Sequence, residues 1–155
     1  MREIKFRCWD KTDERMITAD FVEKGEYSSW PTTLAVGFHG LPIAFDRDSF
    51  KENKITGWNR DHNLTLMQFT GLKDKNGKEI YEGDVVLVPN AFYDPSEGES
   101  PNEIKKVDYH AGEFGMDRGK GGDWESLKDY WDGKEGAEDL EIIGNIYENP
   151  DLLKP

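Results

Sequence analysis

Apolar and polar residues alternate with a period of two in several short stretches, which is the pattern of strands with one buried face. The alternation in Ile4–Trp9 resumes at Arg15–Thr18 after a polar stretch, and this predicts an N-terminal hairpin. Two shorter apolar runs, Leu34–Phe38 and Ile43–Phe45, predict two brief strands further along the chain.

The middle of the chain contains the clearest strands. Leu64–Phe69 has apolar residues on both faces, which is typical of a strand in the centre of a sheet or barrel. Asn76-Gly77 predicts a tight turn because both residues tolerate a positive φ. Val85–Val88 is the next strand, and Pro89 ends it because proline has no N–H to donate to a sheet.

The C-terminal part combines a second hairpin, a helix and a closing strand. The hairpin is predicted over Ile104–Tyr109 and Gly112–Met116, and the closing strand over Leu140–Tyr147. Gly144 inside the closing strand indicates a bulge or a close backbone approach. Together the elements predict a mainly β fold, a small barrel or sandwich with one short helix inserted near the C-terminal part.

The helix is predicted over Asp123–Trp131, where Asp123 can cap the first turn. Its aromatic face and nearby carboxylates form a candidate interaction surface, which consists of Trp124, Leu127, Tyr130, Trp131, Asp129 and Asp132. One interpretation packs this face against the β-structure. The other makes it an aromatic anchor for a partner protein or a second subunit, with the carboxylates steering a basic partner.

The net charge of −12 is concentrated in the second part of the chain. Residues 1–93 hold 15 acidic and 13 basic residues, a net of −2, whereas residues 94–155 hold 17 and 7, a net of −10. The longest basic patch, Lys73, Lys75 and Lys78, is interrupted by acidic residues. Phosphate backbones are repelled by such a chain, so direct nucleic-acid binding is disfavoured.

The remaining chemistry points away from an enzyme. Cys8 lies in an alternating stretch and is predicted to be a small buried hydrophobe, and a single cysteine fits a reducing cytoplasm. The three histidines are far apart in the sequence, and Asp46 and Asp48 lack the pattern of a calcium loop. We expect no catalytic residue, no cofactor and no metal site. No apolar run reaches the 18 residues of a membrane-spanning helix, so no membrane is expected.

Three segments, in this order, resemble the YopX-like proteins of bacteriophages and prophages in Gram-positive bacteria. They are Ile4–Asp10 with Met16 following, Leu66–Val86 and Leu140–Pro150. The resemblance implies one compact, mainly β domain over residues 1–155, related to small SH3-like barrels. It carries over no catalytic residue. The chain departs from the family pattern at about residues 90–139, where a simple pair of strands is extended by an acidic loop and the predicted helix.

These observations predict a phage or prophage accessory protein in the cytoplasm of the bacterial host. Its role would be non-catalytic, through binding a host or phage protein or through self-assembly as a homo-oligomer. The alternative is a nucleic-acid-binding SH3-like module, in which Trp9 or Phe69 would stack on bases. That alternative requires one shared face for Lys5, Arg7, Arg15, Lys73, Lys75 and Lys78.

Overall fold

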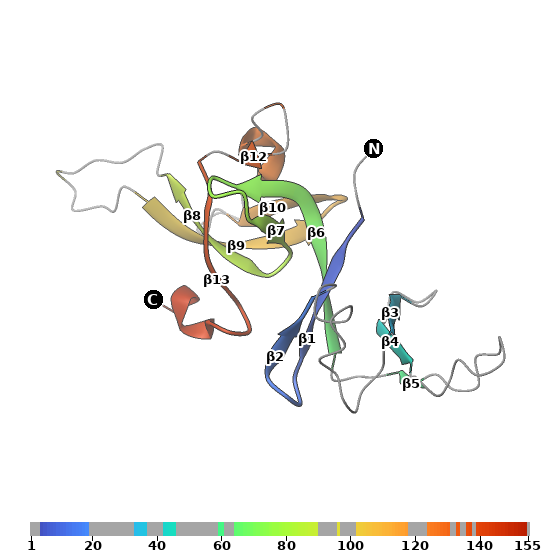
Figure 1. The fold of residues 1–155 in the computed structure, drawn as a ribbon. Coiled ribbons are helices and arrows are strands. Elements are labelled where there is room, and N and C mark those ends of the chain that lie inside the picture. The colour runs from blue at the N-terminus through green and yellow to red at the C-terminus, as the bar shows by residue number, and fades with distance from the viewer. Residues whose placement is uncertain are drawn as a thin grey trace. The chain divides into compact units, whose positions relative to one another are not determined.

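The structure is a computed structural model that describes residues 4–18, 33–36, 42–45, 59–60, 64–89, 96, 102–117, 124–130, 133, 136–137 and 139–154. The chain, drawn in Figure 1, is divided into two compact units. The N-terminal unit is Phe6–Met67, and the C-terminal unit combines Met1–Lys5 with Gln68–Pro155. The single domain expected over the whole chain stays a prediction.

The N-terminal unit contains the predicted hairpin. Strand β1 (Phe6–Asp10) pairs antiparallel with β2 (Arg15–Ile17). The carboxylate of Asp10 accepts the backbone N–H groups of Thr12 and Asp13, at 2.9 and 3.2 Å, and so holds the turn between the strands. Cys8 is fully buried in β1, which confirms its assignment as a core residue.

A separate antiparallel sheet in the same unit confirms the two brief strands. Its strand order is β3-β4-β5, with β3 at Thr33–Val36, β4 at Pro42–Phe45 and β5 at Asn59–Arg60.

The C-terminal unit is built on an antiparallel sheet with the order β11-β10-β9-β8-β13. Figure 1 shows β8, β9 and β10 as neighbouring arrows, with the red β13 strand beside β8. The predicted second hairpin and closing strand are both confirmed. The strand bounds are β8 Asp84–Pro89, β9 Asn102–His110, β10 Glu113–Asp117, β11 Trp124–Ser126 and β13 Glu141–Asn145.

Strand β6 (Leu64–Asp74) is longer than the sequence pattern predicts. In the C-terminal unit it pairs antiparallel with β7 (Glu79–Tyr81) and parallel with the short β12 (Gly136–Ala137). Gly77 adopts φ 80° in the turn between β6 and β7, so the Asn-Gly turn is confirmed. The parallel pairing with β12 had no signal in the sequence.

The core of the C-terminal unit lies on one face of its sheet. Because side chains alternate along each strand, every second residue of β8, β9 and β10 points to this face. The buried residues of the core are Ile80, Val86, Val88, Val107, Phe114, Met116, Leu127, Ala137 and Leu140.

The helix predicted over residues 123–131 is confirmed only in its second part. Trp124–Ser126 forms strand β11, and only Leu127–Tyr130 forms a short 3₁₀ helix, η3. The backbone of Trp124–Ser126 pairs with β10 instead of closing helical turns.

A second 3₁₀ helix, η4 (Pro150–Leu153), follows β13. The mainly β fold class is confirmed, and both η3 and η4 are short helices of the C-terminal part. In the described part of the chain, no helix has the length and apolar character needed to cross a membrane.

Candidate interaction surface

The structure separates the residues of the predicted interaction surface. Leu127 is 2% exposed and belongs to the core, and Tyr130 is half-buried against the same core. Asp129 is exposed, and Trp124 is half-buried in β11. Trp131 and Asp132 lie outside the described residues. Part of the expected aromatic face therefore packs inward, as one of its two interpretations requires.

Trp124 lies on the face of the sheet opposite to the core. Its ring covers Gly115 of β10, where an added Cβ would be 2.6 Å from two ring atoms and 2.3 Å from the backbone oxygen of Glu125. The ring of His110 is 5.5 Å from the Trp124 ring, between centroids. The Trp124 ring thus packs directly on the backbone of Gly115, and any larger residue at this position would collide with the ring.

A compact ionic cluster holds β11 and η3 against β9 on the core face. The Nζ of Lys105 lies 2.8 Å from carboxylate oxygens of both Glu103 and Glu125, and the hydroxyl of Tyr130 donates to Glu125 at 2.5 Å. The side chains of Lys105 and Glu125 are only 11% and 12% exposed. Burial lowers the pKa of Lys105, but the two glutamates outweigh it and the net pKa is raised.

Glu113 joins β10 to the start of η3. Its carboxylate accepts hydrogen bonds from the Nζ of Lys128 and the hydroxyl of Ser126, both at 3.1 Å. These two donors favour the charged form, so the pKa of Glu113 lies below its ordinary value. On the neighbouring strand, Lys106 pairs with Asp108. Glu113 and Asp108, each paired with a lysine, lie on the same face of the sheet as Trp124.

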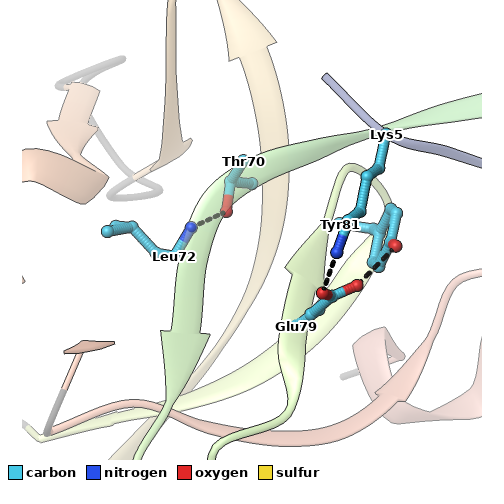
Figure 2. Close-up of polar contacts among 5 residues, drawn as sticks. All are labelled: Lys5, Thr70, Leu72, Glu79 and Tyr81. Atoms are coloured by element: carbon cyan, nitrogen blue, oxygen red, sulfur yellow. Dashed lines mark hydrogen bonds and ion pairs between the residues drawn. The ribbon is translucent and has the colours of Figure 1, made fainter. Parts of the chain in front are cut away.

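A second polar cluster lies where residues before β1 meet β6 and β7 (Figure 2). Lys5 forms an ion pair with Glu79 at 2.6 Å, and the hydroxyl of Tyr81 donates to the other carboxylate oxygen at 2.8 Å. The Nζ of Lys5 also lies 5.5 Å from the centre of the Phe69 ring. Burial opposes ionisation of Glu79, but Lys5 and Tyr81 outweigh it, so the pKa of Glu79 is lowered. Within this cluster the positive charge of Lys5 balances the negative charge of Glu79.

The same close-up shows how the middle of β6 is held (Figure 2). The hydroxyl of Thr70 accepts the backbone N–H of Leu72 at 3.2 Å and donates to the carbonyl of Ile80 at 2.8 Å. The β6–β7 register shifts between Phe69 and Lys73, so this hydroxyl bonds to the backbone where the ladder is irregular.

Polar residues of the segments that resemble the YopX-like proteins bind backbone groups. Asp74 is buried, and its carboxylate accepts the N–H groups of Asn76 and Lys78 at 2.9 Å and of Ile142 at 3.1 Å. These bonds fix the turn after β6 and tie it to β13. These hydrogen bonds give Asp74 a role in folding.

In two further turns a side-chain oxygen likewise accepts backbone N–H groups. The carboxylate of Asp84 accepts the N–H of Tyr81 at 2.8 Å. The side-chain oxygen of Asn145 accepts the N–H groups of Tyr147 and Glu148 at 3.0 and 2.9 Å.

The structure confirms the bulge that is one of the two features expected at Gly144. The register of β13 against β8 shifts between Ile142 and Gly144, and a Cβ on Gly144 would lie 2.4 Å from the side chain of Asn149. Asp46 and Asp48, the carboxylates weighed for a metal, lie outside the described residues.

The sequence reasoning missed Gly115, His110 and Lys105 as neighbours of the candidate surface. Gly115 and His110 reach Trp124 only through the pairing of β10 with β9 and β11. Lys105 reaches Glu125 across a separation of 20 residues. No local sequence pattern encodes such contacts, although a glycine inside a strand is a general sign of close approach.

The YopX protein family matches residues 5–154. The chain belongs to this family. Two solved structures share its fold: protein EF1440 from Enterococcus faecalis, at 24% identity, and yopX from Bacillus subtilis, at 21%. Both have a TM-score of 0.53, and each comparison covers 99% of this chain and 100% of the other. A search of curated proteins found no match. The resemblance stated from the sequence is confirmed.

Proposed function

We propose that this YopX-family protein is a non-catalytic accessory protein of a bacteriophage or prophage, which acts in the cytoplasm of the host by binding a protein or assembling with itself. The main support is the position of Trp124, a large aromatic side chain that lies outside the core on the other face of the sheet. Binding energy in protein interfaces concentrates in such residues. In contrast, the side-chain oxygens of Asp74, Asp84 and Asn145 accept hydrogen bonds from backbone N–H groups.

The alternative, a nucleic-acid-binding SH3-like module, has less support. The rings expected to stack on bases are largely covered, since Phe69 is 5% exposed and Trp9 is 8% exposed. Three of the required cations already have carboxylate partners: Lys5 with Glu79, Arg15 with Asp13 and Lys75 with Glu141. The charge of −12 adds a general repulsion from phosphate.

Capture from a host lysate tests the proposed function. Tagged protein is incubated with nuclease-treated and untreated lysate, and its own oligomeric state is measured by light scattering. We expect either a host protein that survives nuclease treatment or a defined oligomer, and we expect Trp124→Ala to weaken it while circular dichroism stays unchanged. Partners that disappear with nuclease would instead favour the nucleic-acid module. A monomer that captures nothing would refute the proposal.

A further inference from the structure

We propose that Asn76 is a site of spontaneous modification, at which the Asn76–Gly77 linkage rearranges to isoaspartate at a rate that Asp74 sets. Asn76 and Gly77 are exposed in the turn between β6 and β7, and they form the single asparagine–glycine pair of the sequence. Gly77 has no Cβ to shield its nitrogen, and the space that a Cβ would occupy is open. The inference does not depend on the proposed function.

The reaction is a cyclisation followed by hydrolysis. The Gly77 nitrogen loses its proton to hydroxide and attacks the side-chain carbonyl carbon of Asn76. A new carbon–nitrogen bond forms, the bond to the side-chain nitrogen breaks, and ammonia leaves after it takes a proton from water. A second water molecule then opens the succinimide ring at either carbonyl, and the products are aspartate and isoaspartate.

The native turn opposes the first step. The N–H of Gly77 donates to the backbone carbonyl of Asp74 at 2.8 Å, so the attacking nitrogen is held by its own proton. The carboxylate of Asp74 accepts the N–H groups of Asn76 and Lys78, both at 2.9 Å. Burial raises the pKa of Asp74, but its hydrogen bonds, one of them from the Asn76 side chain, outweigh burial and keep the carboxylate charged. The turn therefore has to open before Asn76 can cyclise.

Local opening of the turn exposes the reacting atoms without unfolding the protein. Residues 75–78 are exposed, so their displacement breaks few apolar contacts. The main resistance comes from Asp74, which is buried and also accepts the N–H of Ile142 at 3.1 Å. Asp74 thus couples the rate of modification at Asn76 to the closing strand β13.

The product loosens the contacts that delayed its formation. In isoaspartate the main chain runs through the side-chain carbons, so the turn gains one backbone atom and the N–H groups of Asn76 and Lys78 lose their spacing around Asp74. The new carboxylate also repels that of Asp74, because like charges meet at short range. After modification, β6, β7 and β13 are held together less tightly.

Peptide mapping by mass spectrometry tests the proposal on the full chain. Folded protein is incubated in mildly alkaline buffer well below its Tm, beside the same protein in urea. A synthetic peptide of residues 73–79, measured with and without urea, corrects for the effect of urea on the chemistry. Electron-transfer fragmentation distinguishes isoaspartate from aspartate. We expect isoaspartate at position 76, formed at least about 10-fold more slowly in the folded protein than in urea.

Variants identify the residue that sets the rate. Asp74→Asn should accelerate the reaction in the folded protein about 10-fold, because an amide cannot accept all three N–H groups. Lys105→Met, which removes an ion-pairing residue outside the turn, is the matched control and should change the rate less than about 2-fold. Asn76→Gln, with a longer side chain, should abolish the modification.

Hydrogen exchange gives a measurement that needs no variant, in case Asp74→Asn does not fold. The protection of the Gly77 amide in the wild-type protein should equal the factor by which folding slows the modification, since both processes require the same opening. Unequal factors would contradict control by the turn.

Two results would overturn the proposal. One is an equal rate in the folded protein and in the peptide, or no isoaspartate even in urea. The other is equal acceleration by Asp74→Asn and Lys105→Met, which would show that the reaction proceeds through global unfolding. Lysate capture and oligomeric state are measured separately, so neither result changes the standing of the proposed function.

Discussion

Asp74 shows how a single buried carboxylate orders a segment of the family motif. Its two oxygens accept three backbone N–H groups, two from its own turn and one from Ile142, 68 residues further along the chain. An unpaired buried N–H costs roughly 1–3 kcal/mol, so each of these bonds matters for stability. The side chain joins a local turn to the closing strand.

Asp74→Asn should destabilise the protein by about 2 kcal/mol, because the new amide group has to face either the N–H of Ile142 or those of the turn. Urea unfolding measures the change. Asp151→Asn, an exposed substitution in η4, is the control and should change stability by less than about 0.5 kcal/mol. A loss no larger than the control would contradict the role of Asp74.

The pH dependence of stability offers an independent check on Asp74. Burial opposes its ionisation, but the three backbone hydrogen bonds outweigh burial, so the pKa of the folded state lies below the ordinary value. The stabilisation is therefore complete above the unfolded pKa of about 4 and is lost as the pH falls through the lowered pKa. The difference in unfolding free energy between wild type and Asp74→Asn should stay constant from pH 7 to about 5 and shrink below about 4. A constant difference down to pH 2 would exclude this linkage.

Ala111 occupies a backbone conformation that suits glycine. In the two-residue turn between β9 and β10, Ala111 has φ 51° and Gly112 has φ 92°. Ala111→Gly should stabilise the protein by about 0.5 kcal/mol, since relief of strain exceeds the entropy cost of glycine. Gly112→Ala, with open space around it, should destabilise by about 1 kcal/mol through strain alone. Chemical denaturation of both variants tests the pair, and changes of the same sign would contradict it.

At the scale of elements, β11 illustrates how pairing overrides a helical pattern. Trp124 and Leu127 are three residues apart, which suits one face of a helix, yet they lie on opposite sides of the sheet layer. The backbone of Trp124–Ser126 bonds to β10, and the chain turns at Leu127 to bury that side chain in the core. Tertiary contacts decide such short segments because local propensity is weak.

Gly115→Ala should destabilise β10–β11 by about 2 kcal/mol, because the added methyl group would collide with the Trp124 ring and with the carbonyl of Glu125. Thermal unfolding measures the loss, and the indole N–H signal of Trp124 in NMR spectra should shift. In a Trp124→Ala background the cost should fall but not vanish, since the backbone collision remains. An unchanged cost in that background would show that the ring is not seated on Gly115.

The Lys105 cluster should contribute measurably to holding η3. Lys105→Met should destabilise the protein by about 2 kcal/mol, because it leaves Glu103 and Glu125 without their shared cation. Tyr130→Phe should cost about 1 kcal/mol through the lost hydrogen bond. A double-mutant cycle between Lys105→Met and Glu125→Gln, followed by urea unfolding, gives the coupling. Strict additivity would count against the cluster.

At the scale of the whole molecule, the turn Tyr81–Asp84 is a junction of the C-terminal unit. The N–H of Glu82 donates to the carbonyl of Gln68, and the N–H of Gly83 donates to that of Val107. The carbonyl of Gly83 accepts the N–H of Ile146. One short turn thus connects β6, β9 and the segment after β13.

The net charge of −12 should also limit stability at low salt. Raising the salt from about 0.02 M to about 0.3 M screens the repulsion among carboxylates and should raise the Tm by about 3 °C. Differential scanning calorimetry with sodium chloride and with choline chloride separates screening from specific ion binding. A Tm that falls with both salts would contradict the expected self-repulsion.

The sequence by itself determined most of the longer strands, the Asn-Gly turn, the family and the distribution of charge. These features depend on neighbouring residues: the period-two alternation of β1, the continuous apolar run of β8, the positive φ of Gly77, and the carboxylate of Asp84 beside its own turn. Only the tertiary structure decided the strand β11, the parallel pairing of β12, the packing of Trp124 on Gly115 and the ion pairs of Lys105 with Glu103 and Glu125. Each of these requires contacts between segments far apart in the chain, whose energy appears only when the sheet has formed and which leave no periodic trace in the sequence.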